Sequence, residues 1–226
     1  MAGKRSYQDP CGVARALDLV GERWALLIAR ELLLGPKRFT DLRAGLPTAS
    51  QNVLAQRLRD LEDTGLVRRR KLGPPAGAWV YELTGRGRGL EPVLVALATW
   101  GSRQPMTSAG DLSADALILA LRTTFDSAVA GPLRATYRLA LDDDRYLARV
   151  ADGRLDVARA GQDEAATRTV EPPDATLTSS VGTLRAVVFG DLDPAEAERR
   201  GVLRTEGERA SVARFVALFA RPAPAE

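Results

Sequence analysis

Apolar residues recur at helical spacing through most of the first hundred positions of the chain. Residues 22–34 are apolar almost all round, which is typical of a helix wrapped by others. Ser50 is a good N-cap for a longer helix whose buried stripe is Leu54, Leu58 and Leu61. Four helices are therefore expected before residue 65. The first is capped by Asp9 and ended by Gly21, the second covers 22–34, the third is a short helix near 39–44, and the fourth covers roughly 51–64.

The period changes after Gly65, where two segments rich in β-formers flank a stretch of glycine and proline. The segments LVRRRKL and AWVYELT bracket residues 73–77, so a two-stranded hairpin with a long tip is expected. A last helix of this half carries apolar residues at helical spacing, and Pro92 should start or kink it. These apolar residues are Leu90, Val93, Leu94, Leu97 and Trp100.

The second half of the chain mixes helical and alternating patterns. Residues 117–125 form an apolar helical segment, whereas 136–141 and 146–150 alternate between apolar and polar positions. Asp152-Gly153 is a strong signal for a tight hairpin turn. Strands grouped in the middle with helices around them indicate an α+β fold. Further strands are expected at 155–157, 175–178 and 202–205, with helices around 184–188 and 212–219.

Charge divides the chain at the same place as these patterns. The 226 residues carry a formal charge of +3, but residues 1–105 hold 17 Lys and Arg against 10 Asp and Glu, whereas residues 106–226 hold 15 against 19. The two parts therefore have net charges of +7 and −4. We expect a basic first domain over 8–103 that is attracted to a polyanion, a linker over 104–111, and an acidic second domain over 112–220.

Missing residue types exclude several kinds of chemistry. There is no histidine, the commonest general base and metal ligand, and Cys11 is the one cysteine, so the chain can form no internal disulfide and no cysteine-based zinc cluster. No Gly-x-Ser-x-Gly or phosphate-loop motif occurs either, so we expect no enzyme, no metal and no cofactor. No apolar run approaches the roughly 18 residues of a membrane span, and we expect a cytoplasmic protein without a membrane partner.

The helix expected over 51–64 has a polar face opposite its leucine stripe. Amide and guanidinium side chains such as those on this face can bond base edges in the major groove or hold phosphate. A short helix and a turn of three to four residues precede it, which is helix-turn-helix spacing. The alternative is an ordinary helix with a solvated polar face. The candidate DNA contacts of this region are Arg38, Thr40, Ser50, Gln51, Asn52, Gln56 and Arg59.

A basic run follows this helix in the first strand of the expected hairpin. Strand alternation sends two of the four side chains from Arg68 to Lys71 to each face, so at least two project outward beside the helix. A basic hairpin directly after such a helix is typical of a winged helix, in which the wing grips phosphates or the minor groove of DNA. Arg69, Arg70 and Lys71 are the candidate contacts, and the alternative is a solvated charge run.

Several long segments resemble the HxlR-type winged helix-turn-helix regulators, relatives of the MarR group. They are GERWALLIARELLLGPKRFTDLRAGLP, SQNVLAQRLRDLEDTGLVRRR, the PPAG tip, VYELT and EPVLVALATWG, and they cover about residues 8–102 in the family order. The resemblance implies a cytoplasmic bacterial homodimer that binds a double-stranded DNA operator and pairs through the first and last helices of this domain. The dimer interface would then contain Val13, Leu17, Leu94, Leu97 and Trp100, although each suits the internal core equally.

Cys11 lies just before the first helix, where several HxlR-type members have a cysteine and some use it to sense oxidants or electrophiles. An exposed thiol near a helix N-terminus and near Lys4, Arg5 and Arg15 would react as the thiolate. Gly12 follows it where the family often has proline, which changes the local cap. A disulfide would need a second subunit or a small thiol, and the alternative is a half-buried packing cysteine.

The acidic half resembles the sterol carrier protein type 2 fold over roughly 112–220. The resemblance lies in RATYRLALDDDRYLARVADGRLDVARA and DATLTSSVGTLRAVVFGDLDPAEAERRGVLRTEGERASVARFVALF. That fold is a five-stranded sheet with helices that enclose an apolar tunnel for lipid-like ligands. The candidate lining residues, each of which suits plain core as well, are Phe125, Tyr137, Leu139, Tyr146, Leu184, Val188, Phe189, Phe215 and Phe219.

The leading hypothesis is a transcriptional repressor. It would be a homodimer that binds its operator through the winged helix and responds to an apolar, lipid-like effector in the second domain. In the alternative hypothesis, Cys11 senses oxidants or electrophiles and the second domain is a scaffold without a ligand. An intracellular lipid carrier is the remaining interpretation, but it leaves the winged helix without a function.

Overall fold

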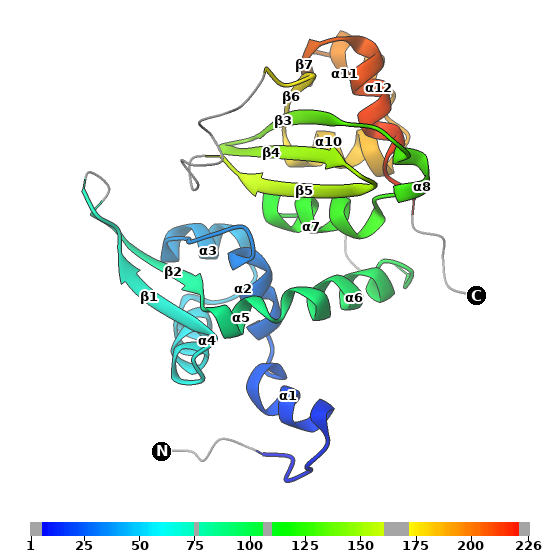
Figure 1. Cartoon of the computed structure of the whole chain (residues 1–226). Coiled ribbons are helices and arrows are strands. Elements are labelled where there is room, and N and C mark those ends of the chain that lie inside the picture. The colour runs from blue at the N-terminus through cyan, green and yellow to red at the C-terminus, as the bar shows by residue number, and fades with distance from the viewer. Residues whose placement is uncertain (1–5, 75–76, 106–109, 161–171, 222–226) are drawn as a thin grey trace. The chain divides into compact units, whose positions relative to one another are not determined.

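Figure 1 shows the computed structural model, which describes residues 6–74, 77–105, 110–160 and 172–221. The chain divides between Leu94 and Val95 into two units, and each is described by itself below. This division falls inside the helix α6 (Glu91–Gly101), whereas the predicted linker is 104–111. Residues 106–109 of that linker lie outside the described residues, and the predicted domain boundaries stay predictions.

The first unit consists of helices followed by a hairpin, in the order that the hydrophobic pattern predicts. The predicted helix over 22–34 begins three residues late, because the backbone of Trp24 is left-handed with φ 79° and cannot continue a right-handed helix. Pro92 lies in the first turn of α6, as predicted. The remaining helices are α1 (Gly12–Val20), α2 (Ala25–Leu32), α3 (Phe39–Gly45), α4 (Gln51–Asp63) and α5 (Gly85–Arg88), and the strands are β1 (Val67–Lys71) and β2 (Trp79–Leu83).

Aliphatic side chains fill the space between these helices. Leu54, Leu58 and Leu61 of α4 are all buried, as their spacing predicts, and they belong to one cluster with Ile28 of α2 and Leu42 of α3. Burying a side chain of this size stabilises the fold by about 1.5–3 kcal/mol. The leucine stripe therefore fixes the orientation of α4, and its opposite face is left to the solvent.

Gly87 lies where α5 passes close to the chain at Leu66. A β-carbon at residue 87 would overlap the backbone carbonyl oxygen of Leu66, which also accepts a hydrogen bond from the Thr84 amide. We expect Gly87→Ala to lower the free energy of unfolding by about 3 kcal/mol, as measured by urea unfolding of the full chain. Gly85→Ala is the matched control, since a β-carbon there meets open space. Equal losses in the two variants would contradict this account of α5.

The second unit is built on a five-stranded sheet in the order β5-β4-β3-β6-β7. β3 runs parallel to β6, and the other neighbouring strands are antiparallel. The helix predicted over 117–125 begins three residues earlier, because Ser113 caps it by accepting a hydrogen bond from the Ala116 amide. The elements are α7 (Ala114–Thr124), α8 (Ser127–Ala130), β3 (Ala135–Leu141), β4 (Asp144–Ala151), β5 (Arg154–Arg159), β6 (Ala175–Ser179), α10 (Val181–Phe189), α11 (Pro194–Arg199), β7 (Leu203–Gly207) and α12 (Arg209–Ala217).

Strand alternation gives this sheet an inner and an outer face. Tyr137 and Leu139 on β3 and Tyr146 on β4 are buried, whereas Arg138 and Arg149 are exposed, which follows the alternation expected for 136–141 and 146–150. The helices α7 and α12 contact β5 and β6 respectively, and α10 contacts both helices. Figure 1 shows these helices gathered against the sheet. This arrangement confirms the predicted α+β fold.

Candidate nucleic-acid interface and effector domain

A turn joins α3 to α4, and two side-chain hydrogen bonds fix the position at which α4 begins. Ser50 caps α4, and its Oγ accepts a hydrogen bond from the Val53 amide at 3.3 Å. Arg43 of α3 donates to the Oε1 of Gln51 at 3.5 Å, a contact that joins the two helices. At the other end of α3, Arg38 and Thr40 are both exposed. The helix-turn-helix that the spacing predicts is therefore present.

The predicted polar face of α4 is exposed. Asn52, Gln56 and Arg59 all reach the solvent, and they lie on successive turns of the helix. Arg59 donates to the Oε1 of Gln56 at 2.7 Å, and the amide of Gln56 donates to Asp60 at 2.9 Å. The face thus presents amide and guanidinium groups in one row, which is the set of donors and acceptors that reads base edges.

The basic run of the wing divides between the two faces of β1. Arg68 and Arg70 both reach Glu82 on β2, whose carboxylate accepts from their Nε atoms at 2.6 and 2.9 Å. Burial alone would raise the pKa of Glu82, but the hydrogen bonds and charges of Arg70 and Arg68 outweigh it and hold that pKa below its ordinary value. Among the candidate contacts, Arg70 is therefore engaged inside the hairpin.

The pairing of Glu82 makes the wing sensitive to acid. A carboxylate whose pKa is lowered on folding stabilises the folded state above its unfolded pKa, near 4.5, and loses this effect as the pH falls through its folded pKa. We expect Glu82→Gln to lower the free energy of unfolding at neutral pH and to flatten its decline below about pH 4.5. Urea unfolding of both proteins between about pH 3 and about pH 7 measures this. Parallel curves for the two proteins would contradict the pairing.

Arg69 lies on the other face of β1 and stacks on aromatic rings. Its guanidinium carbon lies 4.6 Å from the ring centre of Trp79 and 5.9 Å from that of Tyr81, and Tyr81 is its cross-strand partner. Lys71 shares this face by alternation and is exposed, as is Trp79. Sequence analysis did not single out Trp79 or Tyr81. Both belong to the segment AWVYELT, and the strand register places them opposite Lys71 and Arg69. This face carries the cations of the wing that Glu82 does not hold.

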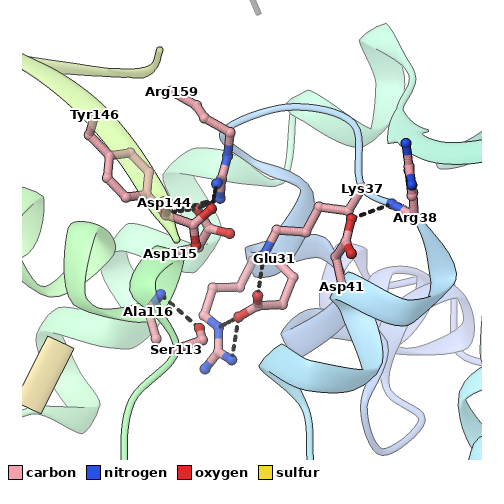
Figure 2. A network of polar contacts seen from close by, with 11 residues as sticks. Glu31, Lys37, Arg38, Asp41, Ser113, Asp115, Ala116, Asp144, Tyr146 and Arg159 are labelled. Atoms are coloured by element: carbon pink, nitrogen blue, oxygen red, sulfur yellow. Dashed lines mark hydrogen bonds and ion pairs between the residues drawn. The ribbon is translucent and has the colours of Figure 1, made fainter. Parts of the chain in front are cut away.

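A buried ion cluster supports the base of the wing. Glu31 of α2 has no exposed surface, and its carboxylate accepts from Lys37 Nζ at 2.6 Å and from Arg30 at 2.8 Å. The backbone of Lys37 pairs with that of Tyr81 through two hydrogen bonds of 2.8 and 2.9 Å. Figure 2 shows Glu31 and Lys37 meeting. The cluster ties α2 to the strand that carries Tyr81, and sequence analysis missed it.

The candidate dimer residues differ in their exposure. Val13 and Leu17 on α1 are 70% and 40% exposed, and Leu97 and Trp100 on α6 are 45% and 64% exposed. Leu94 is buried and belongs to the core cluster of the first unit. Four of the five candidates are therefore apolar side chains in contact with solvent, which is where an uncovered interface would appear.

Cys11 is exposed and caps α1. Its Sγ accepts a hydrogen bond from the Ala14 amide at 3.3 Å, and its own amide donates to Asp9 at 2.9 Å. The prediction that Asp9 caps this helix is therefore wrong: Cys11 is the N-cap, because its sulfur and not the Asp9 carboxylate accepts from an amide inside α1. Lys4 and Arg5, which sequence analysis placed near this thiol, lie outside the described residues.

Most of the candidate lining residues of the second unit are apolar side chains of its core. Four aromatic rings form one cluster: Tyr137 and Phe215 lie 4.8 Å apart, Phe215 and Phe219 5.0 Å, and Phe125 and Phe219 6.4 Å between centres. Leu139, Leu184 and Val188 are buried as well, whereas Phe125 and Phe189 are partly exposed. Tyr146 is the exception, because its hydroxyl belongs to a polar network.

That network buries an arginine between two carboxylates (Figure 2). Arg159 of β5 pairs with Asp115 of α7 at 2.5 Å and with Asp144 of β4. Tyr146 donates from its hydroxyl to Asp115 at 2.9 Å, and its ring lies 4.9 Å from the guanidinium carbon of Arg159. Burial lowers and the two carboxylates raise the pKa of Arg159, with a net rise that keeps it charged. The network fastens α7 to the edge of the sheet.

Neither a membrane span nor a metal-ligand cluster occurs among the described residues. In the ranges that the structure describes, no helix is long and apolar enough to cross a membrane. Nor do three or more His, Cys, Asp or Glu side chains of those ranges gather where they could hold a metal ion.

Comparison with known proteins matches the two halves of the chain separately. The family model described as HxlR-like helix-turn-helix matches residues 19–109, and that of the SCP-2 sterol transfer family matches residues 118–220. The HTH-type transcriptional regulator YvaP of Bacillus subtilis (strain 168) is 36% identical over 88 residues, which are 39% of this chain and 82% of the relative.

Two other similar proteins each match about two fifths of the chain. The HTH-type transcriptional regulator Rv3095 of Mycobacterium tuberculosis (strain ATCC 25618 / H37Rv) is 43% identical over 91 residues, 39% of this chain and 56% of the relative. The solved structure of the redox regulator HypR in its oxidized form has 32% identity and a TM-score of 0.40, and covers 43% of this chain and 100% of its own. The chain therefore belongs to the HxlR-like helix-turn-helix family of transcriptional regulators and carries an SCP-2-type domain as its second half.

Proposed function

We propose that the protein is a cytoplasmic, homodimeric repressor whose two α4 helices enter successive major grooves of a pseudo-palindromic operator. The observation that carries this proposal is the exposed row of Asn52, Gln56 and Arg59 on a helix whose opposite face is locked by buried leucines. Such a helix can enter the major groove of DNA while its leucines stay packed against the core. Arg69 and Lys71 of the wing supply cations for the phosphates beside it.

Exposed apolar side chains support the dimer. Val13 and Leu17 lie one helical turn apart on α1, and Leu97 and Trp100 lie one turn apart on α6. Each pair forms a short apolar stripe that water surrounds in the single chain. Pairing with a second copy would cover both stripes, and an operator with two half-sites requires that the two α4 helices lie one turn of DNA apart, about 34–36 Å.

The SCP-2-type unit supplies a place for an apolar effector. Its core contains the cluster of four aromatic rings, one from the sheet and three from the helices and their ends, and the family resemblance assigns lipid-like ligands to this fold. An effector of this kind alters repression only if it binds the DNA-competent and DNA-free states with different affinities. We propose that it lowers operator affinity.

The test begins with an operator selected from random duplexes by the purified full chain. We expect Asn52→Ala with Gln56→Ala to weaken binding to that operator at least tenfold, since each good bidentate base contact is worth about 1–3 kcal/mol. Binding to a random duplex, which depends on phosphate contacts, should change by less than about twofold and serves as the control. Equal losses on both duplexes would contradict base reading by α4.

Cys11 favours a second candidate function, a regulator switched by oxidants or electrophiles. Its sulfur is exposed on α1, the helix that also carries the proposed dimer residues Val13 and Leu17. A bond formed at this sulfur, to a partner subunit or to a small thiol, would disturb the pairing of α1. Operator release after treatment with diamide, compared between the wild type and Cys11→Ser, tests this switch. Equal release in both proteins would rule it out.

A further inference from the structure

Tyr137 lies at the centre of the inner face of the SCP-2-type sheet. Its partners in the neighbouring strands are Ala148 on β4 and Ala175 on β6, so the phenol ring stands between two of the smallest side chains. Phe215 of α12 covers it at 4.8 Å. The ring has no exposed surface.

The hydroxyl of Tyr137 is buried without a hydrogen-bond partner among the described residues. A buried hydroxyl without a partner destabilises the folded state, whereas phenylalanine would offer the same ring without that cost. Burial raises the pKa of Tyr137, with Arg214 acting against the rise and Asp174 adding to it, so the hydroxyl is a neutral donor at physiological pH.

The other large phenol of the same sheet face behaves differently. Tyr146 is equally buried, but its hydroxyl donates to Asp115 and accepts from Arg159. Its polar group is used inside the fold, whereas that of Tyr137 is not. The contrast makes Tyr146 the natural control for any test of Tyr137.

We propose that Tyr137 is the specificity-determining residue of the effector site, and that its hydroxyl donates a hydrogen bond to a carbonyl or carboxylate oxygen of an otherwise apolar ligand. The inference rests on the proposed function, which places an apolar effector in this unit. It adds that the ligand must carry an acceptor oxygen that meets Tyr137 among the rings of Phe215 and Phe219. A purely hydrocarbon ligand of the same shape leaves the hydroxyl without a partner and binds more weakly.

The first test compares ligand-free stability in two conservative variants of the full chain. Tyr137→Phe removes a hydroxyl without a partner, so its Tm should equal or exceed that of the wild type. Tyr146→Phe removes a hydrogen-bonded hydroxyl, so its Tm should fall by about 2–4 °C. A fall of the same size in Tyr137→Phe would overturn the inference, because it would mean that the hydroxyl is already satisfied without a ligand.

The second test uses matched probes of one size: acetophenone, ethylbenzene and benzoate, titrated calorimetrically into the wild type and Tyr137→Phe. We expect the wild type to prefer acetophenone to ethylbenzene by about fivefold, the effect of one hydrogen bond, and Tyr137→Phe to lose this preference while keeping its affinity for ethylbenzene. Stronger binding of benzoate than of acetophenone would identify a carboxylate, favoured by Arg214, as the preferred acceptor.

The outcomes separate this inference from the proposed function. Equal binding of acetophenone and ethylbenzene by the wild type overturns the role of Tyr137 and leaves the apolar effector site standing. Absence of binding by all three probes overturns both the site and the role of Tyr137, and DNA binding by the winged helix is unaffected by that result.

Discussion

Replacing Arg69 and Lys71 together by alanine is expected to weaken operator binding at least tenfold. Both side chains lie on the face of β1 that Glu82 does not engage, so their charges are available to phosphates. Loss of two phosphate contacts should also reduce the slope of log affinity against log salt by about 2. Fluorescence anisotropy with a labelled operator at several salt concentrations measures both quantities.

Arg68→Ala is the matched control for this variant. It removes one positive charge from the same strand, but on the opposite face and from a pair with Glu82. We expect it to change operator affinity by less than about threefold, since Arg68 lies on the other face of β1 and Arg70 still pairs with Glu82. Unchanged affinity in the double variant, or an equal loss in the control, would contradict the assignment of Arg69 and Lys71 to the DNA-facing side of the wing.

Replacing Asp115 by alanine is expected to cost about 3–5 kcal/mol of the free energy of unfolding. The variant leaves Arg159 largely buried beside an empty position and removes the acceptor of the Tyr146 hydroxyl. Asp144 still pairs with Arg159, but the removal of a fully buried partner from a largely buried charge is far more costly than a broken surface pair. Urea unfolding of the full chain, followed by circular dichroism, measures the loss.

Asp152→Asn provides the comparison, because Asp152 pairs with Arg134 at 2.6 Å with both side chains largely exposed. Asparagine also tolerates the left-handed backbone of residue 152. The expected loss there is at most about 1 kcal/mol. Losses of similar size in Asp115→Ala and Asp152→Asn would contradict the prediction that the network around Arg159 stabilises the fold more than a surface ion pair does.

Local patterns predicted the helices because their causes are local. The spacing of Leu54, Leu58 and Leu61 predicts which face of α4 is buried, and Ser50 predicts where the helix begins. The late start of α2 could not be predicted, because a left-handed residue such as Trp24 is held by its surroundings rather than by its own preference.

Cross-strand and long-range contacts set the limit of such predictions. Alternation divides the basic run of β1 between two faces, but only the register with β2 shows that Glu82 takes Arg70 and leaves Arg69. The same limit applies to Tyr137 and Tyr146, which share one pattern in the sequence. Their hydroxyls differ because Asp115, far away in the chain, reaches one of them and not the other.

The central claim is specific DNA binding by the winged helix, and one measurement tests it most directly. Purified full chain is titrated onto labelled DNA from upstream of its own gene, with a random duplex as competitor, at about 50 mM and about 200 mM salt. We predict tight, competitor-resistant binding that weakens at least tenfold at the higher salt concentration. Equal, weak binding to both duplexes would contradict the claim and would favour a lipid carrier instead.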